Sequence, residues 1–185
     1  EIIEKLNNIN TPKIVVFNKT DLVKNQEKFD ELISRYSNLN SAFITKISAT
    51  QDEIPVGCLI VDSATGEIIS STHNLSQHSE DATAHAEILA IRQACQILKQ
   101  NRLWDMDMYV TLEPCPMCAG AIVNSRIKKI YIGAAQQKTG ACGSKVNIIE
   151  EYKTETNIDV EFNILQEECL SILQKFFKEL RKQIK

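Results

Sequence analysis

The sequence predicts an α/β fold, in which short strands and helices alternate along the chain. Runs of β-branched and apolar residues that are typical of buried strands alternate with longer segments whose apolar residues recur at helical spacing. The composition is that of an ordinary globular protein, with 43% hydrophobic and 24% charged residues in 185. The pattern also changes near residue 51, so we expect two parts, residues 1–50 and 51–185.

Residues 1–50 have the pattern of a β-α-β fragment. Lys13–Phe17 reads K-I-V-V-F and is expected to form a buried strand. Residues 26–37 place apolar side chains at helical spacing, which predicts a helix. Ala42–Ile47 is expected to form a second strand.

Residues 51–185 have the pattern of a larger unit. Ile54–Val61 and Glu67–Ser71 are strand-like segments on either side of a turn, which predicts a hairpin. The further elements expected are the helices Ala84–Gln100, Cys115–Asn124 and Leu165–Ile184, the strands Met108–Leu112 and Lys129–Ile132, and a loop-rich region with some local structure over 133–160.

Charge and hydropathy exclude several classes of protein. The net charge is −3 and the pI is about 5.7, so any nucleic-acid surface has to be a local patch. No apolar run is long enough to cross a bilayer, and no signal-peptide pattern opens the sequence. We therefore expect a cytoplasmic protein with reduced cysteines.

The strongest chemical signal is a histidine followed about thirty residues later by two close cysteines. His85 precedes Ala86-Glu87, and Cys115 and Cys118 lie in the sequence P-C-P-M-C. Catalytic zinc is typically held by three nitrogen and sulfur ligands, with the fourth position open. Cys115 and Cys118 lie at i and i+3 of one expected helix, so both thiolates can face one point at its N-terminus. These three residues are the predicted ligands of one Zn²⁺ per subunit.

Glu87 is predicted to be the catalytic base. It lies two residues after His85, where its carboxylate can reach a zinc-activated water and carry the proton to a leaving amine. A structural zinc site is the alternative, and it would need a fourth ligand from His73, His78 or Cys142. The joint pattern H-x-E…P-C-x-x-C favours the catalytic site, because it is the signature described for zinc-dependent nucleobase deaminases.

At these residues the sequence resembles the cytidine-deaminase-like superfamily and, more closely, the bacterial tRNA-specific adenosine deaminases. The resemblance covers roughly residues 53–185. The stretches that carry it are Pro55–Gly57, Thr83–Glu87, Thr111–Ala121 and Lys138–Ser144. The zinc motif fits cytosine, guanine and adenosine deaminases alike, whereas K-T-G-A-x-G-S points to the tRNA enzyme.

The resemblance implies a three-layer α/β/α sandwich around a mixed five-stranded sheet. It implies a homodimer that hydrolytically deaminates the wobble adenosine of a tRNA anticodon to inosine. His85, Cys115 and Cys118 match the zinc ligands, and Glu87 matches the proton shuttle. Asn74 matches the asparagine that contacts the flipped base. The family also opens with an amphipathic helix, which this chain lacks at the matching position.

Residues 1–50 resemble the last part of a GTPase G domain of the Era or MnmE kind. Asn18-Lys19-Thr20-Asp21 matches the guanine-specificity motif N-K-x-D, and Ser48-Ala49 matches the later S-A motif. The phosphate-binding G-x-x-x-x-G-K-[ST] loop is absent from the sequence. We therefore interpret this part as a fusion or truncation remnant and do not expect GTP binding.

Three functional hypotheses follow. The first is a tRNA adenosine deaminase, the second is a free-base or nucleoside deaminase of guanine or cytosine type, and the third is a guanine-nucleotide-binding module. Basic residues expected near the site favour RNA over a free base. They are Lys138 and Lys145, which are the candidate substrate-binding lysines, and Arg126, Lys128 and Lys129.

Overall fold

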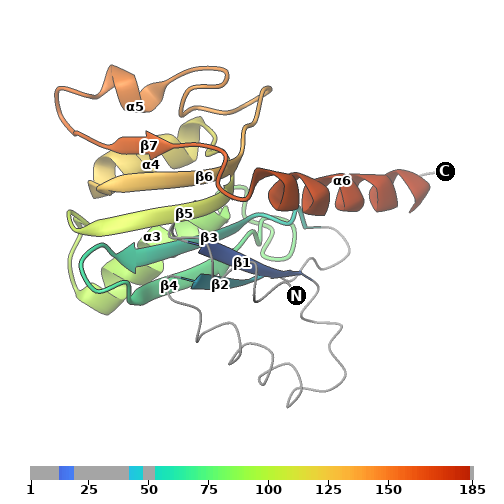
Figure 1. Ribbon diagram of the computed structural model, residues 1–185, viewed down its shortest axis with the longest axis horizontal. Coiled ribbons are helices and arrows are strands. Elements are labelled where there is room, and N and C mark those ends of the chain that lie inside the picture. Colours follow the sequence, from blue (N-terminus) through green and yellow to red (C-terminus); the bar gives the residue numbers. More distant parts are fainter. Residues whose placement is uncertain (1–12, 19–41, 48–52, 184–185) are drawn as a thin grey trace, which may run out of the picture.

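A computed structural model describes residues 13–18, 42–47 and 53–183 (Figure 1). Its central feature is a mixed five-stranded sheet with the order β4-β3-β5-β6-β7. The strands are β3 (Gly57–Asp62), β4 (Ile68–His73), β5 (Met106–Leu112), β6 (Lys129–Ala134) and β7 (Asp159–Glu161). β3 runs antiparallel to both β4 and β5, whereas β5, β6 and β7 are parallel. The expected α/β fold with a mixed five-stranded sheet is therefore confirmed.

Two helices cover one face of this sheet. They are α3 (Ala86–Leu98) and α4 (Pro116–Ser125), which lie behind the strands in Figure 1. Alternate strand residues face them, because successive side chains of a strand point to opposite faces. The main core therefore joins Cys58 and Ile60 of β3 to small residues of α3 such as Ala90 and Ala94.

The opposite face carries a second, smaller core. Leu59 and Val61 of β3 pack there with Tyr109 of β5, whose ring stacks on that of Tyr131 at 4.4 Å between centroids. The long helix α6 (Gln166–Gln183) begins beside β6, where Cys169 is buried, and then extends beyond the sheet (Figure 1). The remaining helix, α5 (Ile148–Glu151), is a single turn.

A separate two-stranded parallel sheet precedes the main one. β1 (Lys13–Asn18) pairs with β2 (Ala42–Ile47), so both strands predicted in the N-terminal part are present. β2 lies beside β3 and β4, in front of the sheet in Figure 1. The helix expected at 26–37 and most of the N-K-T-D and S-A residues lie outside the described residues. The division of the chain at residue 51 stays a prediction.

The structure differs from the expected elements at the start of β3. β3 begins at Gly57 rather than at Ile54, because Pro55 lacks an N–H and Val56 donates its N–H to Ile54 in a tight turn. The region 133–160, expected to be loop-rich with some local structure, contains the short α5 and the start of β7. Within the ranges that the structure describes, no helix is long and apolar enough to cross a membrane.

Candidate active site

The three predicted zinc ligands lie at the beginnings of two helices. His85 is the residue before the first turn of α3, and Cys115 has the same position at α4. Pro116 occupies the first turn of α4, where its missing N–H costs no hydrogen bond. Cys118 follows in the same turn and is fully buried. The starts of both helices therefore meet at one place.

The three ligand atoms have the spacing that tetrahedral zinc requires. Nδ1 of His85 lies 3.6 Å from Sγ of Cys115 and 3.5 Å from Sγ of Cys118, and the two sulfurs are 3.7 Å apart. Zn–S bonds of about 2.3 Å and a Zn–N bond of about 2.05 Å at tetrahedral angles give S–S edges of about 3.8 Å and N–S edges of about 3.6 Å. The residues therefore fit the metal without rearrangement.

The surroundings of the two cysteines favour a thiolate. The pKa of Cys115 is lowered to about 5, chiefly by the hydrogen bond between its sulfur and that of Cys118, with further help from the Cys118 N–H, the charge of His85 and the Met117 N–H. The same hydrogen bond and burial raise the pKa of Cys118. The pair thus holds one negative charge at the helix start, which prepares it for a cation.

No fourth ligand joins this group among the described residues. His73, His78 and Cys142, the residues considered as a fourth ligand, are not part of it. Three protein ligands leave one position open, as in catalytic rather than structural zinc sites.

Glu87 lies in the first turn of α3, close to the ligands but outside their group. Its side chain is buried, and this burial raises its pKa to about 7. A carboxyl group with such a pKa can take up and release a proton near neutral pH, as a general acid–base catalyst must.

His85, Cys115 and Glu87 line a cavity of about 150 Å³. Asn74, which the family resemblance implies to contact substrate, lines the same cavity. Apolar walls come from Ile54, Val56 and Leu112, and polar groups come from Glu113, Gln136 and Thr139. A partly open pocket with apolar walls and a few polar groups is the usual form of a small-molecule or nucleobase site.

Two buried carboxylates that sequence reasoning missed hold the loops around this cavity. Glu53 accepts hydrogen bonds from the loop that follows β4. Glu113, at the end of β5, accepts three backbone N–H groups, from Gln136 at 2.9 Å and from Cys142 and Ser144 at 3.0 Å. The only sequence signal for Glu113 was its place directly before P-C-P-M-C.

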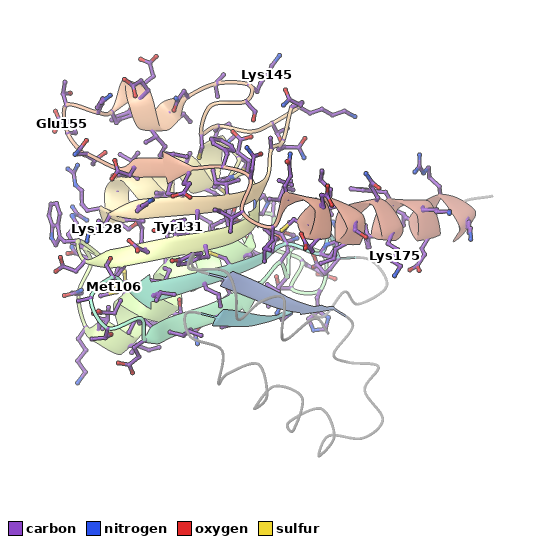
Figure 2. The ribbon with its side chains drawn as sticks, in the orientation of Figure 1. Met106, Lys128, Tyr131, Lys145, Glu155 and Lys175 are labelled. Carbon is purple, nitrogen blue, oxygen red and sulfur yellow. The ribbon has the colours of Figure 1, made fainter. Side chains whose placement is uncertain are left out.

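The predicted basic residues separate into two groups. Lys138 lies between the cavity residues Gln136 and Thr139, and the Lys145 backbone N–H donates to Gly140 in the same loop. Figure 2 shows Lys145 far from Lys128, which lies near Met106 at the opposite end of the strands.

The expectation that Arg126, Lys128 and Lys129 lie near the site is wrong. Arg126 ends α4, whose ten residues span about 15 Å from the cysteines at its start, and Lys129 begins β6, whose other end faces the site.

The sequence is similar to a known family and to known proteins. The family model of the cytidine and deoxycytidylate deaminase zinc-binding region matches residues 33–134. A tRNA-specific adenosine deaminase of Haemophilus influenzae is 41% identical over 165 residues, which are 89% of this chain and 92% of that protein. Another from Bacillus subtilis is 43% identical over 140 residues, 76% of this chain and 86% of that protein.

Solved structures agree with these matches. One from a study of A-to-I editing by tRNA:A34 deaminases at the wobble position superposes with a TM-score of 0.62 at 41% identity, over 66% of this chain and 88% of that chain. A guanine deaminase from Nitrosomonas europaea has a TM-score of 0.60 at only 18% identity, over 95% of this chain and 91% of that chain, and shows the fold alone.

The match therefore includes the motif that supplies the ligands, the sheet that positions them and most of the chain's length. The chain belongs to the cytidine and deoxycytidylate deaminase zinc-binding family, and within it to the tRNA-specific adenosine deaminases.

Proposed function

We propose that this protein hydrolytically deaminates the wobble adenosine of a tRNA anticodon to inosine, with release of ammonia. The observation that carries the proposal is the tetrahedral spacing of His85, Cys115 and Cys118 beside the buried carboxyl of Glu87. The named relatives support the choice of tRNA as substrate.

The residues of the site have separate roles in the reaction. His85, Cys115 and Cys118 would hold the zinc, which supplies Lewis acidity that makes water a nucleophile near neutral pH. Glu87 accepts the proton of the attacking water and delivers it to the amine that leaves the ring. Asn74, which lines the same cavity, binds the base, and the apolar residues of the cavity exclude bulk water.

Charge on the loop beside the cavity supports an RNA substrate rather than a free base. Lys138 and Lys145 are both exposed on the segment that also contributes Gln136 and Thr139 to the cavity. In a protein of net charge −3, two cations at this position favour phosphate groups that flank the target nucleotide. We propose that both lysines contact the tRNA backbone. We also propose that the enzyme acts as a homodimer in the cytoplasm.

The experiment is deamination of an anticodon stem-loop by the zinc-loaded protein, with inosine as the measured product. The matched control is the same stem-loop with guanosine in place of the wobble adenosine. Guanine and cytidine are supplied separately as free compounds. Inosine from the adenosine stem-loop alone supports the proposal. Ammonia from guanine or cytidine, without inosine from the RNA, would show the free-base or nucleoside deaminase instead.

Two further measurements test the remaining proposals. Light scattering of the purified protein gives its mass in solution, and we expect twice the 20.9 kDa of one chain. Titration with GDP should give no binding signal, since the chain lacks the phosphate-binding loop.

A further inference from the structure

Glu53 is a buried carboxylate that the catalytic scheme does not use. It lies directly before the cavity residue Ile54 and is only 1% exposed. Its Oε1 accepts the backbone N–H groups of Gln77 at 2.5 Å and His78 at 2.9 Å. Its Oε2 accepts a hydrogen from Nδ2 of Asn74 at 2.8 Å. The carboxylate therefore ties the loop after β4 to the chain before β3.

The bond to Asn74 fixes the orientation of an amide that faces the cavity. An ionised carboxylate can only accept hydrogen bonds, so the NH₂ end of the Asn74 amide has to face Glu53. Oδ1 of Asn74 then points away from Glu53, where the Ser76 hydroxyl approaches it at 3.5 Å. Asn74 itself is 8% exposed and lines the cavity with His85 and Glu87. One rotation of the amide by about 180° would exchange its donor and acceptor within the site.

We propose that Glu53 is a positioning residue for the deamination. Its carboxylate sets which end of the Asn74 amide faces the bound nucleoside, and so determines which edge of the base is accepted. This inference rests on the proposed function. It goes beyond that function by assigning the recognition of the base to a pair of residues, of which only Asn74 touches substrate.

Glu53→Gln separates this role from a purely structural one. The introduced amide keeps an oxygen that can accept from Gln77 and His78, but it places an NH₂ group where Oε2 was. Asn74 can satisfy that new donor only by rotating its own amide so that Oδ1 faces it. All the hydrogen bonds are then remade, so the fold is retained while the Asn74 amide is inverted in the cavity. A structural role would leave kcat/KM unchanged in this variant.

The experiment is a double-mutant cycle on the zinc-loaded enzyme, with Glu53→Gln, Asn74→Ala and the two combined. The anticodon stem-loop is the substrate, and kcat/KM, zinc content and Tm are measured for each protein. We expect Glu53→Gln to lower kcat/KM by about 10- to 100-fold with normal zinc content and little change in Tm, because misplaced groups in an active site cost about this much. In the Asn74→Ala background the same change should have less than about a 3-fold effect, since the amide that it inverts is gone.

Glu113→Gln is the matched control. Glu113 is also a buried carboxylate beside the cavity that accepts backbone N–H groups, but its bonds go to Gln136, Cys142 and Ser144 and not to Asn74. Glu113→Gln should change kcat/KM by the same factor in the wild-type and Asn74→Ala backgrounds.

The NMR signal of the Asn74 side chain gives a second measurement, which does not depend on turnover. The NH₂ resonances of Asn74 can be identified by their loss in Asn74→Ala, and they should shift in Glu53→Gln. Equal effects of Glu53→Gln in both backgrounds, or unshifted resonances, would overturn the positioning role while wild-type inosine formation still supports the proposed function. Absence of inosine with the wild-type enzyme would overturn both.

Discussion

Sγ of Cys115 lies 3.6 Å from Nδ1 of His85, although the two residues are 30 positions apart and belong to different helix starts. The contact is possible because β5 carries the chain across the sheet and delivers the start of α4 next to the start of α3. Both helices pack on the same face, against the same core. The metal site therefore lies where the starts of the two helices meet.

Removal of a ligand should therefore affect metal content and stability together. We expect Cys115→Ser and Cys118→Ser to reduce zinc to well below one ion per chain and to lower the Tm, because zinc joins two elements that are otherwise held only by packing. Metal analysis and thermal unfolding measure the two effects.

Cys95→Ser and Cys169→Ser are the controls, since neither thiol belongs to the ligand group. Cys169 is buried beside β6, so its replacement can lower the Tm but should leave one zinc per chain. Zinc loss from either control variant would contradict the assignment.

Glu87→Ala tests the proton carrier. General acid–base catalysis typically contributes about 10²- to 10⁴-fold, so we expect kcat for inosine formation to fall by at least that factor. Zinc content should stay normal, because Glu87 is not among the ligands. Glu80→Ala, at an exposed position of the preceding loop, should keep the wild-type rate. A Glu87→Ala enzyme that retains zinc and activity would assign the proton transfer to another group.

The metal site could be predicted from sequence, whereas the groups that support it could not. His85, Cys115 and Cys118 carry a spacing that has chemical meaning by itself. Glu53 and Glu113 carry none, because a lone glutamate in a sequence is usually an exposed residue. Their burial depends on backbone N–H groups supplied by loops more than 20 positions further along the chain. Such partners exist only once the sheet has formed.

The fold shows the same limit. Strands with several apolar residues, such as β5 and β6, could be predicted within about two residues, since burial on both faces leaves a clear pattern. β7 is three residues long, and Val160 is its only apolar residue. It is a strand because it pairs with β6 at the edge of the sheet. The prediction that Arg126, Lys128 and Lys129 lie near the site was wrong for a related reason. Distance along the sequence does not show at which end of a strand a residue lies.

Salt dependence distinguishes the two groups of basic residues. Binding of the stem-loop should weaken as salt rises, because phosphate contacts release counterions. Lys138→Ala and Lys145→Ala should each reduce the slope of log Kd against log salt by about one. Lys128→Ala is the matched control at the far end of the sheet and should leave the slope unchanged (Figure 2). A flat response of the wild-type protein would indicate a small uncharged substrate.

Deletion of residues 1–50 tests whether the N-terminal part is a passive remnant. β2 lies beside β3 and β4, on the face where Leu59 and Val61 of β3 are buried. As a passive remnant the segment should be dispensable, so we expect the Tm to stay within a few degrees and the zinc content to be unchanged. The zinc ligands all lie after residue 84, at the starts of helices on the opposite face. A Tm that falls by more than a few degrees at unchanged zinc content would instead show that the segment stabilises the sheet.

Gly140→Ala tests the loop that Glu113 holds beside the cavity. The backbone N–H of Gly140 donates to the carbonyl of Gln136 at 2.7 Å. A Cβ at Gly140 would collide with that same carbonyl oxygen and with the carboxylate of Glu113, which is itself fixed by three N–H groups. Neither group can move aside without moving the loop. We therefore expect the free energy of unfolding to fall by about 1–3 kcal/mol. Because Gln136 and Thr139 line the cavity, kcat/KM should fall as well.

Gly120→Ala is the control, since a Cβ there meets nothing within 4 Å and alanine favours the α4 helix by about 1 kcal/mol. Denaturant unfolding and inosine assays on both variants measure these effects, and wild-type stability and activity in Gly140→Ala would show that the loop has room to shift.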